Sequence, residues 1–479
     1  MSIHIWGNIM NQPQFKHQEF SIDATTRKKI LRQDRIQPAS KNYYLYFDSK
    51  KFEIENYSAF SIAIKSDDIS FFKNDKLYKG VLRVDELDIF EAEYKLTRFA
   101  EDNIVVLNLN ENVFPVEAIL AIETIKKTLE EFDHQLEAYS SLPQNFKTSV
   151  SELRVWLEKL SKKINEIQKS SFEKNLKNLQ EYEESVVFFT NNYMMKNLPK
   201  FAQTMGLSLA GVDEKLVKKC YEFLRNEVGH IFYKSTYGNR AYAKPRGYAG
   251  DFEMMNNVYS NELRGEDLFS KCMQRYFTDN PAGKAVRNRL NYLNNKIENT
   301  VRNNSFSKIL AVASGPAAEI QKFLVEKPEL AEKCEIHLID QDDEALKYSQ
   351  KEIMIICRAK NIKPRIFFHN IAIKNIINEG LSIGSFDLIY SAGLFDYFTD
   401  PVAQFACKRL FEALNPKGQL IIGNFSTNNP AQFIMEAIGD WYLIYRDEKT
   451  LKKLFNEVCA DLIIESEPES VNLFAILNK

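Results

Sequence analysis

The last third of the chain alternates short apolar runs with helical patterns, and this alternation restricts the fold more than any other feature. The runs are KILAVA, CEIHLID, RIFFHNI, FDLIYSAG and GQLIIGNF, followed by DLIIESE and LFAILNK. Strands that alternate with helices build a doubly wound, mostly parallel sheet. We therefore predict an α/β domain over residues 301–479.

Two regions of different character precede this domain. Residues 1–120 carry aromatic and β-branched runs such as NYYLYFD and NIVVLNL, which predict a small antiparallel sheet or barrel. Residues 121–300 place apolar side chains every three or four positions among many charges, which predicts amphipathic helices. The chain thus divides into a β-rich domain, a helical region and an α/β domain.

Composition excludes several classes of protein. The 63 basic and 65 acidic side chains nearly cancel, so no strong field attracts nucleic acid or anionic lipid. Six cysteines are scattered without a C-x-x-C pair, and the histidines form no cluster with metal-ligand spacing. The first residues lack a signal peptide, and no apolar run reaches the ~20 residues that span a membrane. We expect a cytoplasmic protein without a bound metal.

The first strand of the α/β domain leads into a turn that can bind a nucleoside. Gly315 lets the backbone approach a ligand closely, and the helix that follows offers free N–H groups. Asp340 ends the next strand, where a carboxylate can accept hydrogen bonds from ribose hydroxyls. A dinucleotide turn needs three glycines to wrap a pyrophosphate, so a single glycine favours a ligand without phosphate. S-adenosyl-L-methionine fits that description, and an ordinary strand-to-helix turn is the alternative.

Other strand ends supply further candidates for the cofactor site. Small residues end the fourth strand and leave room for a ligand, while Asn370 can either read adenine or serve as a turn residue. The predicted cofactor-binding residues are Ser314, Gly315, Pro316, Asp340, Gln341, Asn370, Ile371, Ser391, Ala392, Gly393, Tyr248 and Asp251.

Several motifs of the domain together resemble a known family. SGPAAE, HLIDQD, SAGLFDYF, LNPKGQLIIGNF and DWYLIYR are similar, in order and spacing, to the class I S-adenosylmethionine-dependent methyltransferases. The resemblance implies a Rossmann-like fold, S-adenosyl-L-methionine as cofactor and Asp340 as the ribose-binding acid. Ala317 and Ala318 depart from the family, because glycine is usual there.

The segment KPRGYAGDFEMMN, residues 244–256, interrupts the helical region with a loop that we expect to cover the active site. Asp251 can orient a ligand, or it can cap the helix that follows. With YFTDNPAGKAVRNRL, SAGLFDYF and MEAIGDWYLIYR, the segment resembles the bacterial 3-hydroxypalmitic acid methyl ester biosynthesis methyltransferases over roughly residues 185–479. That resemblance implies a 3-hydroxy fatty acid as methyl acceptor and a quorum signal as product.

The acceptor decides which side chains the chemistry needs. A carboxylate nucleophile is ionised near neutral pH, so it needs no base but does need a cation or donors to position it. Arg246 and Arg446 are the candidate cations, with Tyr397 and Tyr445 as hydrogen-bond partners.

A hydroxyl or amine acceptor would instead need a general base. His369 and Asp396 are the candidates, and a packing role for His369 is the alternative. Another small molecule or a protein remains open as acceptor. A protein of another class, a signalling scaffold that binds without turnover, also remains open.

The N-terminal region shows a weaker resemblance. RKKILRQDR (27–35) and IENYSAFSIAI (54–64) resemble a PilZ domain, a family that binds cyclic di-GMP through an arginine motif and an aspartate-serine-glycine motif. Asn56 and Ser58 match, Ser61 replaces the glycine and the arginine spacing differs, so we do not expect cyclic di-GMP as a partner. Arg27, Arg32 and Arg35 can form a solvated basic face, and the helices of the middle region can pair in a homodimer or remain solvated.

Overall fold

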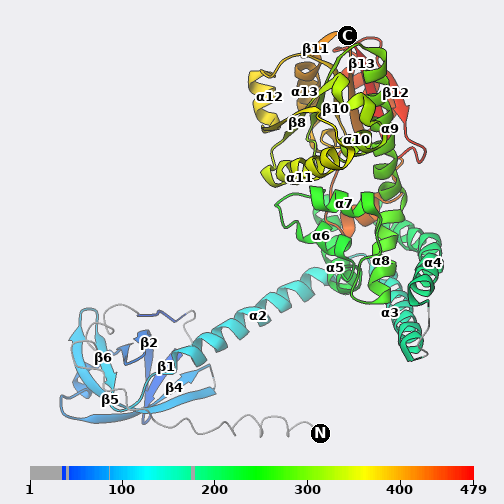
Figure 1. Cartoon of the computed structure of the whole chain (residues 1–479). Helices are drawn as coiled ribbons and strands as arrows, with labels where there is room; N and C mark the ends of the chain where they lie inside the picture. Colours follow the sequence, from blue (N-terminus) through cyan, green and yellow to red (C-terminus); the bar gives the residue numbers. More distant parts are fainter. Residues whose placement is uncertain (1–34, 39–42, 86, 174–177) are drawn as a thin grey trace. The chain divides into compact units, whose positions relative to one another are not determined.

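The computed structural model describes residues 35–38, 43–85, 87–173 and 178–479 (Figure 1). The chain forms two compact units, Met1–Glu137 and Ala138–Lys479. Arg27 and Arg32 of the predicted basic face lie outside the described residues. In the described part of the chain, no helix is long and apolar enough to cross a membrane.

The first unit contains a closed antiparallel barrel with the strand order β1-β2-β3-β6-β5-β4. Alternate side chains of its strands point inward, and rings such as Phe47 and Tyr94 meet edge to face in the interior. The predicted β-rich N-terminal domain is confirmed. Its elements are β1 Tyr43–Phe47, β2 Lys50–Ser58, β3 Ser61–Lys65, the 3₁₀ helix η2 Ile69–Phe71, β4 Leu77–Val84, β5 Leu87–Ala100 and β6 Ile104–Leu109.

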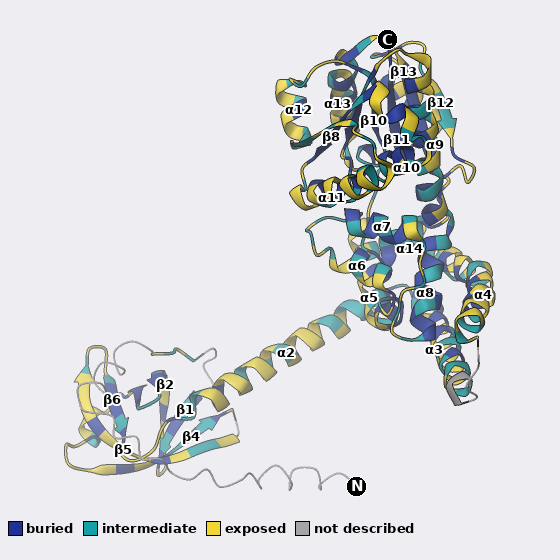
Figure 2. Cartoon of the chain, viewed as in Figure 1, coloured by how far each residue is buried: buried dark blue, intermediate teal, exposed yellow. Residues whose placement is uncertain are grey.

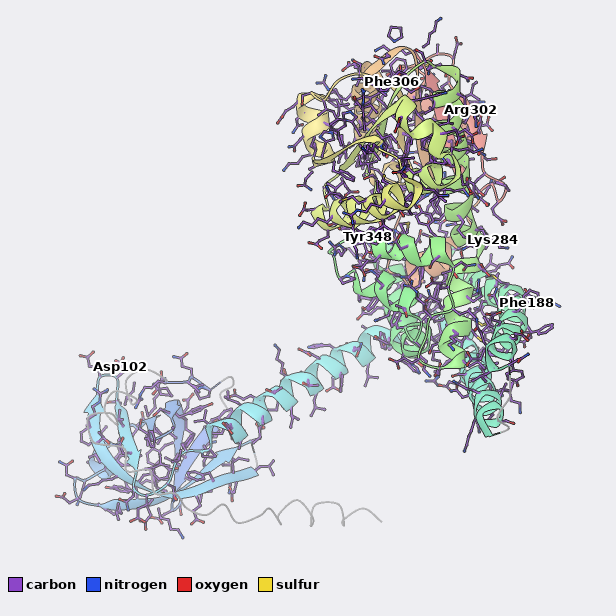
Figure 3. All side chains as sticks on the ribbon, viewed as in Figure 1. Asp102, Phe188, Lys284, Arg302, Phe306 and Tyr348 are labelled. Carbon is purple, nitrogen blue, oxygen red and sulfur yellow. The ribbon has the colours of Figure 1, made fainter. Side chains whose placement is uncertain are left out.

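The predicted helical region is present and contains several helices. From α3 onward these helices pack their apolar faces into shared cores, and much of α2 is exposed (Figure 2). Phe188 of α4 is an exception, because it points outward and is 60% exposed (Figure 3). The helices are α2 Val116–Ser140, α3 Gln144–Glu173, α4 Leu179–Ser208, α5 Glu214–Phe232, α6 Thr236–Ala243, α7 Phe252–Ser260, α8 Leu268–Asp279 and α9 Pro281–Asn303.

A seven-stranded sheet with the order β12-β13-β11-β10-β7-β8-β9 forms the centre of the C-terminal region. The strands from β7 to β11 are parallel, while β13 runs antiparallel to both of its neighbours. All seven predicted strands are present. They are β7 Ser307–Val312, β8 Cys334–Asp340, β9 Arg365–Asn370, β10 Phe386–Ser391, β11 Leu414–Phe425, β12 Ile463–Ser466 and β13 Asn472–Asn478.

Helices cover both faces of this sheet, which explains why its strands are continuous apolar runs. One core joins the sheet to α9, α10 and α11, and a second core joins it to α12, α13 and α15. The elements are α10 Ala318–Glu326, η3 Pro328–Lys333, α11 Asp343–Lys360, α12 Ile373–Glu379, η4 Phe395–Tyr397, α13 Asp400–Glu412, α14 Gln432–Ala437 and α15 Glu448–Phe455.

The strand order reverses at β7, since β8 lies on one side of it and β10 on the other. At such a switch point the connections leave in opposite directions and open a crevice at the carboxyl ends of the strands. The loop before α7 and part of α9 contribute to this crevice from the helical region. The fold therefore places residues from two regions of the sequence around one site.

Candidate functional site

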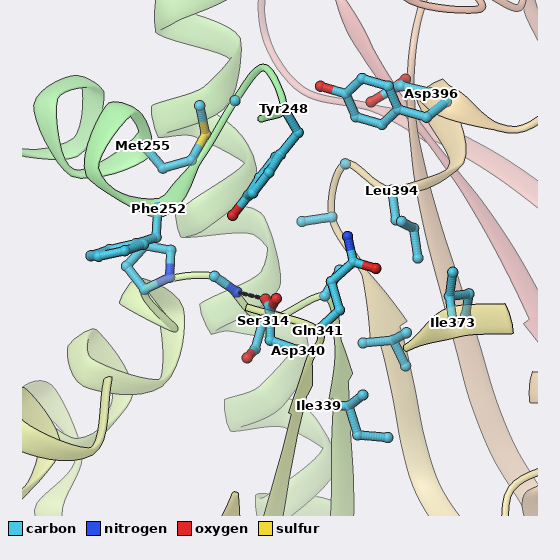
Figure 4. Close-up of a pocket in the computed structure, with 18 of the residues that line it drawn as sticks. Tyr248, Phe252, Met255, Ser314, Ile339, Asp340, Gln341, Ile373, Leu394 and Asp396 are labelled. Carbon is cyan, nitrogen blue, oxygen red and sulfur yellow. Dashed lines mark hydrogen bonds between the residues drawn. The ribbon is translucent and has the colours of Figure 1, made fainter. Parts of the chain in front are cut away.

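A cavity of about 400 Å³ lies in the crevice at the carboxyl ends of β7, β8 and β10. Tyr248 and Met255 approach it from the helical region, and Leu394 and Ile373 approach it from the opposite side (Figure 4). Most of the lining is apolar, with a few polar groups among the carbon atoms. This combination is typical of a pocket for a small organic ligand.

The turn after β7 is built from residues in an unusual backbone conformation. Ala313, Gly315 and Ala317 have φ angles of 55°, 52° and 49°. A left-handed alanine costs ~1–2 kcal/mol, and such strain gathers at functional sites. A Cβ atom on Gly315 would meet no protein atom within 4 Å, so this residue faces open space in the cavity. Ala317 thus adopts the conformation for which glycine is usual.

Asp340 is held in place at the end of β8 by two backbone amides. Its Oδ2 accepts the N–H of Gly315 at 2.7 Å (Figure 4), and its Oδ1 accepts the N–H of Asp342 at 2.9 Å. Burial raises the pKa of this carboxyl. Each oxygen keeps a lone pair, so the carboxylate can accept two adjacent hydroxyl groups. The hydroxyl of Ser314 is buried, has no hydrogen-bond partner among the residues that the structure describes, and is a further group for a ligand.

The loop 244–251 is fastened to the sheet directly beside Asp340. Arg246 donates two hydrogen bonds to Asp342, Nε to Oδ2 at 2.7 Å and Nη2 to Oδ1 at 2.8 Å. The hydroxyl of Tyr248 donates to the same carboxylate at 2.8 Å. These contacts, with Arg246 first, lower the pKa of Asp342 to about 2. The loop therefore covers one end of the cavity and is held by a charged contact.

Asp396 and Tyr397 line the cavity beyond the end of β10. Asp396 is buried, and its Oδ1 accepts the N–H of Phe425 at 2.6 Å. Burial raises its pKa to about 6. The hydroxyl of Tyr397 donates to the carbonyl of Ala249 at 3.1 Å and accepts the indole N–H of Trp441 at 2.9 Å, so Tyr397 ties the covering loop to the other side of the cavity.

The comparison with protein families bears directly on this crevice. The model of a family described as "Methyltransferase domain", Methyltransf_31, matches residues 303–467. The C-terminal region is a methyltransferase domain. The match includes the turn after β7, Asp340 and the end of β10. The enzyme is a methyltransferase with S-adenosyl-L-methionine as its cofactor. The carboxylate of Asp340 and the hydrogen-bonding groups beside it fit the nucleoside of this cofactor.

Solved structures of low sequence identity align with parts of the chain, whereas no curated protein matches it. A possible exported protein from Bordetella parapertussis has 15% identity and a TM-score of 0.40 over 61% of this chain and 96% of its own. The N-methyltransferase NodS from Bradyrhizobium japonicum, with S-adenosyl-l-homocysteine, has 17% identity and a TM-score of 0.29 over 47% of this chain and 98% of its own. Magnesium protoporphyrin IX methyltransferase from Synechocystis has 11% identity and a TM-score of 0.32 over 41% of this chain and 86% of its own.

The structure brings many of the predicted site residues of the methyltransferase to one cavity. They come from the turn after β7, the ends of β8, β9 and β10, and the covering loop. The predicted residues that line it are Ser314, Gly315, Pro316, Asp340, Gln341, Ile371, Ala392, Gly393, Tyr248, Asp396 and Tyr397.

Other predicted cofactor residues do not line the cavity. The amide of Asn370 donates to the carbonyls of Asp340 and Gln341, at 3.2 and 3.1 Å, as a turn residue does. Asp251 caps α7 through the N–H of Met254 at 2.9 Å, which agrees with the alternative that the sequence left open, and it pairs with Arg240. Ser391 is buried at the end of β10 outside the lining.

Four predicted catalytic residues also lie outside the lining, each held by protein partners or packing. Arg446 is buried and donates to Asp400 and Asn424, with distances of 2.8 and 2.6 Å. His369 stacks on His337, and their ring nitrogens are 2.9 Å apart. The fork of Arg246 is engaged by Asp342, and Tyr445 packs in the core next to the site. Their positions therefore give no support to a direct role in the transfer.

Sequence reasoning missed two charged residues that the cavity contains. Arg289 of α9 is 7% exposed, and its Nη1 and Nη2 donate long hydrogen bonds to the carbonyl of Ala392 at 3.4 Å and the sulfur of Met255 at 3.5 Å. Its Nε has no hydrogen-bond partner among the described residues. Glu319 of α10 is buried and accepts the hydroxyl of Tyr390 at 2.8 Å, and burial raises its pKa. Nothing in one sequence distinguishes Arg289 from the other arginines of its helix. Glu319 could have been found from its place in the first turn after Gly315.

Proposed function

We propose that this methyltransferase methylates the carboxylate of a small apolar acid, such as a 3-hydroxy fatty acid, to give its methyl ester. The observation that carries the proposal is the buried guanidinium of Arg289, which lines the cavity without an ion pair among the described residues. The guanidinium makes long hydrogen bonds to the carbonyl of Ala392 and the sulfur of Met255, at 3.4 and 3.5 Å, and the buried carboxylates of Asp396 and Glu319 interact with it electrostatically. No described carboxylate forms a salt bridge with it, so an anionic ligand can still bind its N–H groups directly.

In this proposal Asp340 accepts the two ribose hydroxyls of the cofactor, and Gly315 and Ser314 line the adjoining part of the molecule. Bound S-adenosyl-L-methionine supplies an electrophilic methyl group. Arg289 lies next to Ala392 and Gly393, at the end of β10, because a Cβ atom on Gly393 would be 2.9 Å from its Nη1. An acid held there would present its oxygen at the mouth of the crevice.

The walls near Arg289 suit a hydrocarbon chain. Met255, Leu394, Phe398 and Leu443 line this cavity, and they offer carbon surface to the rest of the acceptor. Burial of apolar surface is worth roughly 25 cal/mol per Å², so each further methylene of an acid would improve binding. A guanidinium at one end and apolar walls beyond it are complementary to a fatty acid.

The transfer needs little chemistry from the protein. A carboxylate is already ionised at neutral pH, and its oxygen forms the new bond to the methyl carbon as the bond to sulfur breaks. Arg289 would orient the carboxylate, and the apolar walls would exclude water from it. The products are the methyl ester and S-adenosylhomocysteine, with no proton to place.

The test measures the transfer of labelled methyl from S-adenosyl-L-methionine to a series of 3-hydroxy and unsubstituted acids. Methyl esters are expected, and alkali should hydrolyse them. Arg289→Gln should lower kcat/KM by ~10–100-fold, the value of a hydrogen-bonded charge. The matched control is Arg302→Gln, an exposed arginine of the same helix (Figure 3).

The cofactor also carries a carboxylate, so binding measurements must separate the two. Calorimetry of Arg289→Gln with S-adenosylhomocysteine and with methylthioadenosine, which lacks the amino acid, makes the distinction. Unchanged affinity for both supports the acceptor role. Weaker binding of S-adenosylhomocysteine alone would assign Arg289 to the cofactor and remove the main support for an acid acceptor.

A hydroxyl acceptor is the second candidate, because Asp396 offers a base in the cavity. Its pKa of about 6 means that it loses its proton just below neutral pH, as a general base requires. With this base, kcat should rise as the pH increases through about 6. With a carboxylate acceptor, kcat should not change with pH across that range, and alkali should hydrolyse the product.

We also infer that the barrel is PilZ-like and makes contacts instead of binding cyclic di-GMP. Arg35 donates to Asn56 and to the hydroxyl of Ser61, the latter at 3.0 Å, and Ser58 and Ser61 lie 3.0 Å apart. Arg35 is the one arginine of RKKILRQDR that the structure describes, and it already donates to Ser61, the residue that replaces the glycine of the PilZ motif. Calorimetry with cyclic di-GMP should show no binding, and micromolar affinity would contradict this inference.

A further inference from the structure

Helix α2, Val116–Ser140, is exposed over much of its length (Figure 2), and its exposed residues include a row of large apolar side chains. Ile125, Leu129, Phe132 and Leu136 are 59%, 55%, 55% and 68% exposed. We call these four residues the α2 stripe. Single exposed apolar residues are ordinary, but a continuous row of them marks an interaction site.

The spacing of the α2 stripe is that of a coiled coil. Its members follow one another at intervals of four, three and four residues, which are the a and d positions of a heptad repeat. At 1.5 Å per residue the row is about 16 Å long and stays on one side of the helix. Ile122 continues the row toward the barrel, where it packs on the barrel core. Helix α2 therefore presents one narrow apolar seam.

The charges beside this seam indicate which partner it fits. Most charged residues of α2 lie on the outer side of the helix, and the e positions next to the seam hold Lys126 and Asp133. In a parallel pair, e positions face g positions, which here are the uncharged Ala121 and Thr128. In an antiparallel pair, e faces e, so Lys126 of each helix would meet Asp133 of the other. Lys126 also pairs with Asp85 of its own barrel, and its ammonium has further N–H groups to donate.

We propose that the α2 stripe binds the α2 stripe of a second copy of this chain, as an antiparallel two-helix coiled coil. The register places Leu129 against Phe132 and Ile125 against Leu136 across a twofold axis, and it forms the Lys126–Asp133 pair twice. A twofold contact of this kind uses the same surface on each subunit and closes without leaving a free edge.

The first test is the mass of the full-length protein by light scattering at tens of micromolar concentration. A dimer is expected, and Leu129→Asp should convert it to a monomer. The control is Leu120→Asp on the same helix, because Leu120 is 41% exposed on the opposite side from Leu129. A monomeric wild type, or a dimer that survives Leu129→Asp, overturns the proposal. Loss of thermal stability in a monomeric Leu129→Asp variant would show that the stripe packs within one chain.

The second test determines the orientation. Asp133→Lys should weaken the dimer, and the added change Lys126→Glu should restore it because both pairs re-form with reversed charge. The double variant Lys126→Cys/Asp133→Cys should form an intermolecular disulfide, while each single cysteine variant should not. Of the native cysteines, five are buried, and wild type under the same oxidation provides the background. Crosslinking by Ile125→Cys alone would indicate parallel helices and contradict the proposed register.

Discussion

Asp340 shows how one carboxylate can organise a cofactor site. It accepts the N–H groups of Gly315 and Asp342, so it joins the turn after β7 to the start of α11 and still faces the cavity. Because burial raises its pKa while the two amides oppose that effect, the amides help to keep the side chain ionised. The same contacts fix the orientation that the ribose requires.

We expect Asp340→Asn to weaken the binding of S-adenosylhomocysteine by ~10–100-fold, because an amide loses the charge and half of the acceptor sites. Calorimetry measures the change. Asp343→Asn is the control, since this neighbouring carboxylate pairs with Lys347 at the surface. Equal affinities of wild type and Asp340→Asn would mean that the ribose binds elsewhere.

Asp396 makes stability depend on pH in a direction unusual for an aspartate. Its folded pKa of about 6 lies above the ordinary value near 4, so the folded state binds the proton more tightly. The stability from this group is complete below about pH 4 and is lost as the pH rises through about 6.

Asp396→Asn should therefore gain stability relative to wild type as the pH rises. The expected gain is about 1–2 kcal/mol between about pH 5 and about pH 8, from urea unfolding at each pH. The substituted side chain is uncharged at every pH. The pH-dependent part of the difference in unfolding free energy therefore reports the titration of Asp396 alone. A constant difference across this range would show that the folded pKa is ordinary.

At the scale of elements, the covering loop is held at both of its ends. Arg246 and Tyr248 bond to Asp342 at the start of α11, and Tyr397 bonds to the carbonyl of Ala249. Gly250, with a φ of 76°, fits closely against Trp441, since a Cβ atom there would lie 2.9 Å from the indole. A ligand that enters from this side must release these contacts.

Arg246→Gln should increase the dissociation rate of S-adenosylhomocysteine by about tenfold, because removing the guanidinium leaves the loop with weaker bonds to Asp342. Stopped-flow displacement measures this rate. Arg264→Gln is the control, because Arg264 pairs with exposed Glu262 in a nearby segment. If both variants release the ligand at the wild-type rate, the loop does not limit dissociation.

At the scale of the whole molecule, every residue that lines the cavity belongs to the unit Ala138–Lys479. That unit has its own cores between the helices and on both faces of the sheet. Residues 138–300 of the helical region and the α/β region, which the sequence analysis separates at residue 300, thus form one compact body, while residues 121–137 belong to the first unit.

We therefore expect a fragment of residues 138–479 to fold and to bind S-adenosylhomocysteine within about threefold of the full-length affinity, a difference below ~1 kcal/mol. Calorimetry of the two proteins gives the comparison, and thermal unfolding checks the fold of the fragment. Much weaker binding by a folded fragment would show that the first unit contributes to the site.

The sequence by itself determined the elements of the domain and the first contacts of the cofactor. Apolar runs and turns predicted the seven strands from β7 to β13, because burial on both faces leaves a local signature in each strand. The rule that ligands bind at carboxyl ends placed Gly315 and Asp340 together, and their hydrogen bond of 2.7 Å agrees with that prediction.

Only the tertiary structure decided which long polar side chains reach the cavity. Arg289 of α9 lines the cavity, whereas Arg446 hydrogen-bonds to Asp400 and His369 hydrogen-bonds to His337. Each of these choices depends on a partner 32 or more positions away along the chain. A local pattern records whether a residue is buried, but the partner of a flexible charged side chain is set by distances that exist only after the sheet and its helices have packed together.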